Sequence, residues 1–212
     1  MYYKHPSTTL NRLFSNRPYQ GTDPMKAKYL FIGLDANYAE DIDQSEISQE
    51  MYEYLDDGVL FWEKYGVHHP FLLDNYQGDG KFYHRSFAKI GFTQSHAPEI
   101  AFIELLHLPT YGRSKLVPSD LDDQHLVWLN RVILEGDSKY IFMPTSVGNL
   151  MRQTGHFPWI TTKPDVTDSE LKVWFSDENK TVFWHYHFST YGKFTATKEK
   201  QAVAIRALIH DS

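Results

Sequence analysis

Short apolar runs alternate with amphipathic segments along most of the chain, and this alternation is the feature that most restricts its fold. The first run, Tyr29–Gly33, is too short for a buried helix and ends at a glycine, which is typical of a buried strand. Strands that alternate with helices pair in parallel and need cover on both faces of the sheet. We therefore expect an α/β fold, a three-layer α/β/α sandwich with a central, mostly parallel sheet. The predicted strands are residues 27–34, 100–106, 140–143, 171–175 and 181–186.

Helical spacing of apolar residues fills the segments between these strands. The clearest helix, residues 119–135, has Ser119 as its N-cap, aspartates in its first turn and Gly136 at its end. The other predicted helices are residues 9–14, 48–64 with a break near Gly58, 79–90, a helix starting at 146–151, and 197–209. With 212 residues and no internal repeat, the chain is expected to form one domain over residues 1–212. Residues 1–26 are polar and rich in turn signals, and we expect them to be an N-terminal extension.

The composition excludes several classes of function. The chain has no cysteine, which excludes disulfides, thiolate metal sites and cysteine nucleophiles. No stretch has the length and hydropathy of a membrane span, and the first residues lack a signal-peptide pattern. We therefore expect a cytoplasmic, monomeric protein with no membrane partner. The formal net charge of −6 argues against an extended basic surface for nucleic acid, whereas an aromatic content of 16% supplies side chains that can stack on bases.

Polar side chains follow the predicted strands at the points where the strands end. Asp35, Asn37 and Tyr38 follow the first strand, where a plain turn explains Asp and Asn equally well. The carboxyl ends of parallel strands meet at one edge of a sheet, where ligands bind. An aspartate there can activate water, and a histidine after the last strand can stabilise anionic charge. The residues that follow the later strands are His107, Thr110, Arg113, Thr145, Ser146, His185, His187 and Ser189.

The order and spacing of these motifs resemble the uracil-DNA glycosylase superfamily. Members of that family have an α/β/α fold with a central parallel sheet and cleave the N-glycosidic bond of a flipped base. Gly33-Leu-Asp-Ala-Asn37 resembles the first family motif, G-x-[D/N/E]-P-[Y/G], with Ala36 in place of the usual proline. Pro70-Phe71 looks like the pair whose phenylalanine stacks on the base, and the segment 103–113 is similar in outline to a strand followed by a Pro-containing loop with arginine. His187-Phe-Ser189 resembles the final H-P-S motif.

The resemblance implies a role for each of these residues. Asp35 would position or activate the water, and His187 would stabilise the leaving base. Tyr38 and Phe71 would sandwich the base, and Glu104 would read its edge. An ionised glutamate offers only acceptors, whereas the family has an asparagine near this position, so the expected base is not plain uracil. The resemblance also implies that Asn37 and Ser189 contact the substrate and that His107 and Arg113 contact phosphate. The expected partner is DNA or a small molecule that contains a nucleobase. No cofactor is expected.

Two alternatives remain open at this point. His185 and His187 are two residues apart, and in a strand they would share a face and could bind one metal ion with His68, His69 and Asp35. This pattern would indicate a metal-dependent hydrolase. The other alternative is a catalytically inactive relative of the fold that binds a nucleotide, nucleic acid or protein.

Overall fold

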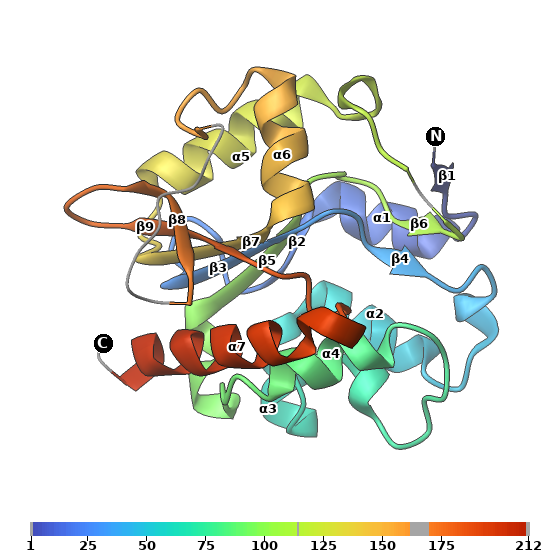
Figure 1. Cartoon of the computed structure of the whole chain (residues 1–212). Coiled ribbons are helices and arrows are strands. Elements are labelled where there is room, and N and C mark those ends of the chain that lie inside the picture. The colour runs from blue at the N-terminus through green and yellow to red at the C-terminus, as the bar shows by residue number, and fades with distance from the viewer. Residues whose placement is uncertain (1, 114, 162–169, 211–212) are drawn as a thin grey trace.

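The chain forms a central six-stranded sheet with helices on both faces, as the predicted α/β/α architecture requires (Figure 1). A computed structural model describes residues 2–113, 115–161 and 170–210. Four strands in the middle of the sheet run parallel, in the order β5-β3-β7-β9, and an antiparallel strand closes each edge. From edge to edge the strands are β2 (Tyr19–Gly21), β5 (Ile100–Glu104), β3 (Tyr29–Gly33), β7 (Tyr140–Pro144), β9 (Thr181–His185) and β8 (Lys172–Ser176).

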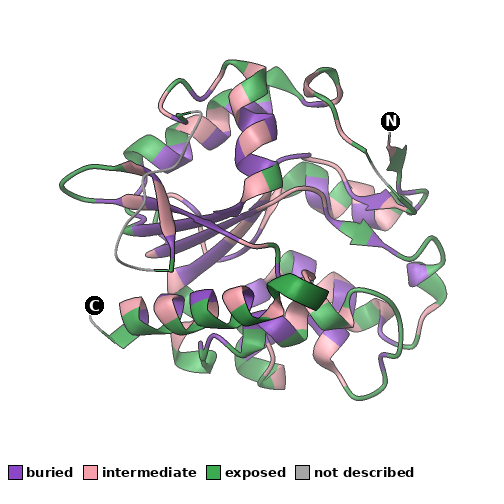
Figure 2. Cartoon of the chain, viewed as in Figure 1, coloured by how far each residue is buried: buried purple, intermediate pink, exposed green. Residues whose placement is uncertain are grey.

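Alternate side chains of β3 face two separate cores, because successive side chains in a strand point to opposite faces. Leu30 and Ile32 pack under α5 (Asp123–Glu135) and α6 (Thr145–Thr154). Tyr29 and Phe31 pack against the opposite layer, which includes α3 (Gly58–Tyr65), α4 (Lys81–Ala88) and α7 (Thr195–His210). The central strands are accordingly buried on both faces (Figure 2).

A third core lies beside the sheet, where α1 (Thr8–Asn16) and α2 (Ser48–Asp56) pack together. Leu10 and Phe14 come from α1, and Met51 and Leu55 come from α2. This core also holds the aromatic rings of Tyr38 and Phe71. Two of the residues expected at the site are thus anchored by a helical subregion rather than by the sheet.

A small second sheet, with the strand order β1-β6-β4, lies beyond the carboxyl end of β3. Its strands are β1 (Tyr3–Lys4), β6 (Thr110–Tyr111) and β4 (Asn37–Tyr38). Asn37 is paired with Thr110 and Lys4 is paired with Thr110 from the other side. The loop after β3 and the loop after β5 are therefore joined through backbone hydrogen bonds as well as through side chains.

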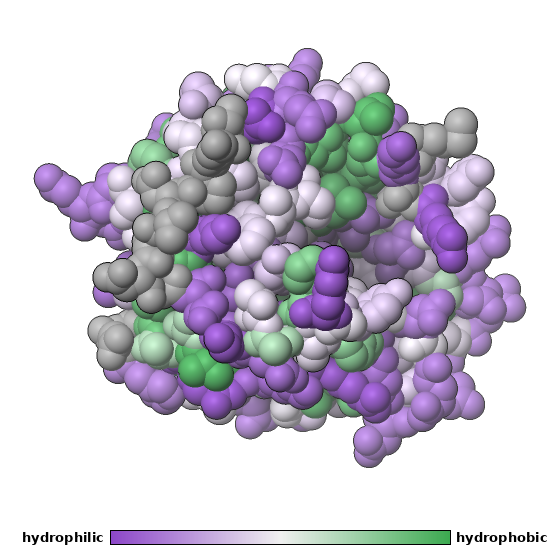
Figure 3. Space-filling model, in the orientation of Figure 1, coloured by the Kyte–Doolittle hydropathy of each residue, from purple (hydrophilic) through white to green (hydrophobic). Residues whose placement is uncertain are grey.

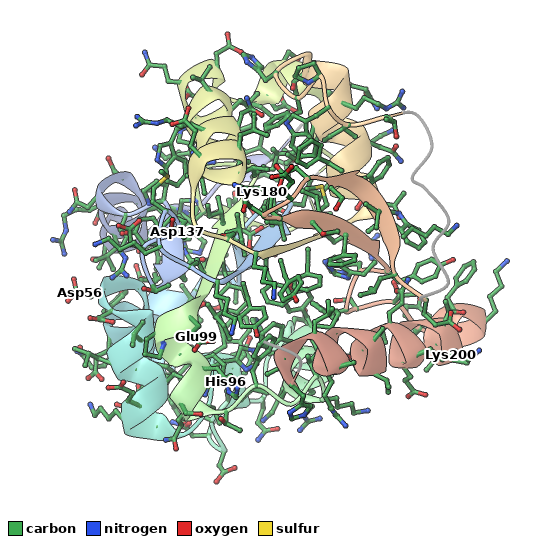
Figure 4. The ribbon with its side chains drawn as sticks, turned by 90° about the vertical axis from the view of Figure 1, so that its left-hand side faces the viewer. Asp56, His96, Glu99, Asp137, Lys180 and Lys200 are labelled. Carbon is green, nitrogen blue, oxygen red and sulfur yellow. The ribbon has the colours of Figure 1, made fainter. Side chains whose placement is uncertain are left out.

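A buried lysine lies at the end of the main sheet where the parallel strands begin (Figure 4). Lys180 precedes β9, and its Nζ donates to the carbonyls of Ile133, Leu134 and Gly136 at distances of 3.0, 2.7 and 2.9 Å. A cation at the carboxyl end of α5 also complements the helix dipole.

The structure confirms the fold class and corrects three local predictions. Pro118–Asp120 form a 3-10 turn, and α5 begins only after Asp122, whose carboxylate accepts a hydrogen bond from His125 N–H at 2.8 Å. Ser119 is therefore not the cap. The expected N-terminal extension contains the edge strand β2, so the segment 2–26 is part of the fold and not merely appended to it. Asn37 and Tyr38 do not lie in a plain turn after β3 but form the short strand β4. No helix in the described ranges has the length and apolar character needed to cross a membrane.

Candidate active site

A cleft of about 470 Å³ opens at the carboxyl ends of the central strands and is visible as the hollow right of centre in Figure 3. Its volume is in the range of small-molecule sites, roughly 300–1,000 Å³. The structure brings all but two of the residues predicted for the site to the wall of this one cleft. Those in the wall are Asp35, Asn37, Tyr38, Phe71, Glu104, His187 and Ser189.

Backbone pairing beyond the strand ends fixes the position of Asp35. The N–H groups of Leu105 and Leu106 donate to the carbonyls of Gly33 and Leu34 at 3.0 Å each. Further along, Thr110 N–H donates to Ala36 O at 2.8 Å. The loop that carries Asp35 therefore runs beside the loop after β5 for its whole length. This pairing holds the loop although Ala36 replaces the proline expected in the first motif.

The Asp35 carboxylate is oriented by a chain of side-chain hydrogen bonds. Thr110 Oγ1–H donates to Asp35 Oδ2 at 2.6 Å, and Asn37 Nδ2–H donates to Thr110 Oγ1 at 3.0 Å. Asn37 Nδ2 also donates to Gly112 O at 2.9 Å. Thr110 is fully buried, so its hydroxyl does not exchange partners with bulk water. Since the amide hydrogens of Asn37 serve the protein, its geometry makes it a positioning residue for Asp35, with only Oδ1 left for a substrate.

Glu104 occupies space that only a glycine on the neighbouring strand can provide. Glu104 is the last residue of β5 and is directly paired with Gly33, the last residue of β3. A Cβ atom at Gly33 would lie 2.0 Å from Glu104 Oε2 and 2.6 Å from its Cδ. The carboxyl group therefore lies across the end of β3, half-buried and beside Asp35. In the described part of the chain, no hydrogen bond or ion pair engages this carboxyl group.

The electrostatic environment favours the neutral form of Glu104. Burial is the main cause, and the nearby charge of Asp35 adds to it; together they raise the pKa of Glu104 from 4.5 to about 8. No lysine or arginine is among the described residues that line the cleft, so no cation offsets these two effects. The site thus holds two adjacent carboxyl groups, of which Glu104 keeps its proton at neutral pH.

His187 lies at the rim of the cleft in a loop that is tied down on both sides. Phe188, which replaces the proline of the H-P-S motif, is buried in the core below β9. The buried amine of Lys198 in α7 donates to Phe188 O at 3.0 Å and to Ser86 Oγ in α4 at 3.2 Å. The core and a buried amine therefore hold the loop in place of a proline.

The backbone selects the tautomer of His187. Ser189 N–H donates to His187 Nδ1 at 3.2 Å, so the proton of the neutral ring is on Nε2. The residue as a whole is exposed, but one side of its ring packs against Tyr83 with centroids 5.1 Å apart. This partial burial lowers the pKa of His187, although Asp35 acts in the opposite direction. His187 is therefore a neutral hydrogen-bond donor at the cleft.

Tyr38 and Phe71 line the cleft but do not form the expected sandwich. Their rings contact each other edge to face, with centroids 6.2 Å apart and an interplanar angle of 80°. One face of Phe71 is already covered by Tyr76, which stacks on it at 4.3 Å. A base cannot lie between Tyr38 and Phe71, and the prediction of such a sandwich is wrong because the third core packs both rings.

Three histidines from two segments form a neutral wall of the cleft; the sequence analysis named His68 and His69 only as possible metal ligands and did not name His84. His69 and His84 stack in parallel with centroids 3.6 Å apart, and His68 Nε2 lies 3.2 Å from His84 Nδ1. Burial lowers the pKa of His68 to about 3 and holds those of His69 and His84 well below their usual range. His69 Nδ1 also accepts a hydrogen bond from Phe71 N–H at 3.1 Å. The adjacent pair His68-His69 was a visible signal in the sequence, whereas nothing local marked His84.

The two predicted phosphate contacts lie outside the cleft wall. The ring of His107 is half-buried against His125, with centroids 5.6 Å apart, and burial lowers its pKa. Arg113 is exposed after β6. Neither residue is positioned by the contacts that hold Asp35, so their contact with phosphate stays a prediction.

The geometry of β9 does not support the predicted pair of metal-binding histidines. β9 ends at His185, so the alternation that would align His185 with His187 does not continue. His185 is buried, its Nδ1 lies 2.7 Å from Tyr186 O, and its ring stacks on Phe188. Only His187 reaches the cleft. Within residues 2–113, 115–161 and 170–210, no group of three or more histidine, aspartate and glutamate side chains is arranged to hold a metal ion.

Comparison with known proteins adds no information on the function of this cleft. No family model matches the chain, and no curated protein matches it in a sequence search.

Proposed function

We propose that this protein hydrolyses the N-glycosidic bond between a sugar and a nucleobase, in the manner of a DNA glycosylase. The observation that carries the proposal is the oriented carboxylate of Asp35 in a cleft whose wall also holds aromatic rings, imidazoles and the neutral carboxyl group of Glu104. Hydrolysis of this bond passes through a cationic sugar and needs an activated water on one side and a stabilised leaving base on the other. The cleft supplies a group for each of these needs.

Asp35 is the group that acts on the sugar side. A carboxylate held by a buried threonine accepts a proton from the attacking water and stabilises positive charge on the sugar carbon. His187 acts on the base side, because its Nε2–H donates a hydrogen bond to an oxygen or nitrogen that gains negative charge as the bond breaks. Tyr83 and the histidines 68, 69 and 84 supply flat, uncharged surfaces against which a base can pack.

The charge distribution of the cleft bears on the choice between DNA and a small substrate. Its wall includes Asp35 and Glu104 and, among the described residues, no lysine or arginine. Phosphate contacts by lysine and arginine supply most of the affinity of proteins for a nucleic-acid backbone. Nucleosides and bases in single-stranded DNA are therefore both candidate substrates, and the assay includes both.

The test measures base release from nucleosides and from single-stranded oligonucleotides, by chromatography, for the wild type, Asp35→Asn and His187→Ala. We expect kcat to fall by roughly 10²–10⁴ in each variant, the scale of acid–base and oxyanion contributions. Circular dichroism of each variant checks that the fold is kept. If the folded wild type releases no base from any substrate of the panel, the proposal is wrong. Tight binding of a nucleoside without release would instead identify a binding protein built on the same cleft.

A further inference from the structure

Among the described residues of the cleft, Glu104 is the carboxyl group to which the proposed mechanism gives no chemical step. Its carboxyl group lies over Gly33, next to Asp35, with no cation or hydrogen-bond donor of the described chain engaging it. Most glycosidases use two carboxyl groups, one on either side of the glycosidic bond. One acts as the acid and the other as the base or nucleophile. The strand ends of β3 and β5 bring two carboxyl groups to the wall of one cleft.

Resting on the proposed function, we infer that Glu104 is the general acid of this site and that the substrate is an N-glycoside of a 6-aminopurine, that is, of adenine or a close analogue. The neutral carboxyl group binds the edge formed by N6 and N7 of the purine. Its O–H donates to N7, and its carbonyl oxygen accepts from the N6 amino group. As the glycosidic bond breaks, the proton of the O–H passes to N7.

On the edge that includes N7, this pairing favours adenine over guanine. Adenine presents an acceptor at N7 beside a donor at N6, which is the pattern that asparagine and glutamine read with an amide. A neutral carboxyl group offers the same donor and acceptor as an amide. Guanine presents acceptors at both O6 and N7, so one oxygen of the carboxyl group would face an acceptor. Uracil leaves as an anion and needs no proton from a carboxylic acid, which would leave Glu104 without a role.

The step balances in protons and electrons. The bond between C1′ and N9 breaks and its electron pair goes to the purine, while N7 takes the proton of Glu104, so that adenine leaves as a neutral molecule. Water adds to C1′ and gives one proton to Asp35. Glu104 ends as a carboxylate and Asp35 as an acid, and proton exchange with solvent restores both. Burial and the charge of Asp35, which keep Glu104 protonated at neutral pH, return it to its starting state.

The first test compares the wild type with Glu104→Gln on 2′-deoxyadenosine and on a single-stranded oligonucleotide that contains dA. Glutamine keeps a donor and an acceptor for the base edge but cannot protonate N7. We expect kcat to fall by roughly 10²–10⁴ with little change in KM. In the wild type, kcat/KM should fall above the Glu104 pKa of about 8, and this high-pH limb should be absent in the variant. Release from only one of the two substrates identifies the natural source of the adenine.

The second test uses the wild type alone and does not depend on the folding of a variant. In 7-deaza-2′-deoxyadenosine a C–H group replaces N7, so the base cannot accept the proton. We expect this analogue to be cleaved slower than 2′-deoxyadenosine by the same roughly 10²–10⁴. Equal rates on the two nucleosides, or an unchanged kcat in Glu104→Gln, would overturn the role of Glu104 as the acid.

The outcome for other bases separates this inference from the proposed function. Deoxyuridine, deoxyinosine and deoxyguanosine are assayed beside deoxyadenosine. Release of one of those bases but not of adenine, lost in Asp35→Asn, would leave the proposed function intact and refute the inference about adenine. Failure on every base would refute the proposed function itself.

Discussion

Replacing Gly33 with alanine should lower activity without lowering stability, because the three atoms nearest to the added methyl group all belong to the Glu104 side chain. The new Cβ atom would lie 2.0 Å from Oε2, 2.6 Å from Cδ and 2.7 Å from Oε1 of Glu104, whereas ordinary contacts begin near 3.4 Å. The carboxyl group must therefore move by about 1 Å or more. A displacement of this size at a reacting group costs on the order of 10²-fold in rate. That loss corresponds to roughly 2.7 kcal/mol of transition-state stabilisation.

The backbone gives no reason for stability to fall with this change. Gly33 is not among the glycines with positive φ, so an L residue can adopt its conformation. Glycine within a strand is less stable than alanine by roughly 0.5–1 kcal/mol, which the variant would regain. The clashing atoms belong to the end of a flexible side chain that opens onto the cleft, so they can move without disturbing the core.

The measurement is kcat for base release together with the free energy of unfolding in urea, for the wild type and Gly33→Ala. Glu104→Ala and the double variant Gly33→Ala/Glu104→Ala complete a double-mutant cycle. Once the Glu104 side chain is removed, the methyl group at position 33 should have no further effect on activity. A Gly33→Ala variant with wild-type activity would refute the argument that this glycine exists to seat Glu104. A large loss from Gly33→Ala in the absence of the Glu104 side chain would do so as well.

Three further perturbations follow from contacts of the cleft. Thr110→Val removes the donor to Asp35 and should lower kcat by roughly 10-fold or more, the equivalent of a hydrogen bond to a charged group, whereas Thr110→Ser should keep activity. The folded chain holds a proton on Glu104 up to a pKa of about 8, whereas the unfolded chain releases it near 4.5. The free energy of unfolding should therefore fall as pH rises from 4.5 to 8, by at most about 1.4 kcal/mol per pH unit. Urea titrations at several pH values should show a flatter profile for Glu104→Gln, and parallel profiles would contradict the assignment. The pH dependence has the opposite sign for His68, because folding lowers its pKa from 6.5 to about 3. The free energy of unfolding should therefore drop as pH falls from 6.5 towards 3. His68→Gln, which keeps a donor towards His84, should weaken that drop.

The short apolar runs made most of the main sheet predictable, because β3 and β7 in its middle are buried on both faces and so lack polar interruptions. The edge strand β2 and the three strands of the small sheet were missed. They are two or three residues long, and no periodicity can be recognised over so few positions. The false start at Ser119 has a similar cause, since Ser119 and Asp122 are both good capping residues and only packing decides between them.

The location of the site was predictable to a greater extent than its internal contacts. Asp35 and His187 follow strands that run parallel, Glu104 ends another, and the topology of such a sheet brings the strand ends together. The partner of Asp35 could not be found in this way, because Thr110 is 75 residues away and its hydroxyl reaches the carboxylate only through the small sheet. The sandwich of Tyr38 and Phe71 failed because the sequence does not show that these rings fill a core of their own.

The small sheet ties the site to residues far from it in the chain. Tyr3 and Lys4 pair with β6 beside Thr110, and His5 bonds to Pro109 O through its N–H and to Ala39 O through its ring. A protease cut or a bulky fusion partner close to these residues would therefore loosen the hold on Asp35 while leaving the main sheet untouched. Preparations that differ only in the treatment of this segment should melt at the same temperature yet differ in specific activity.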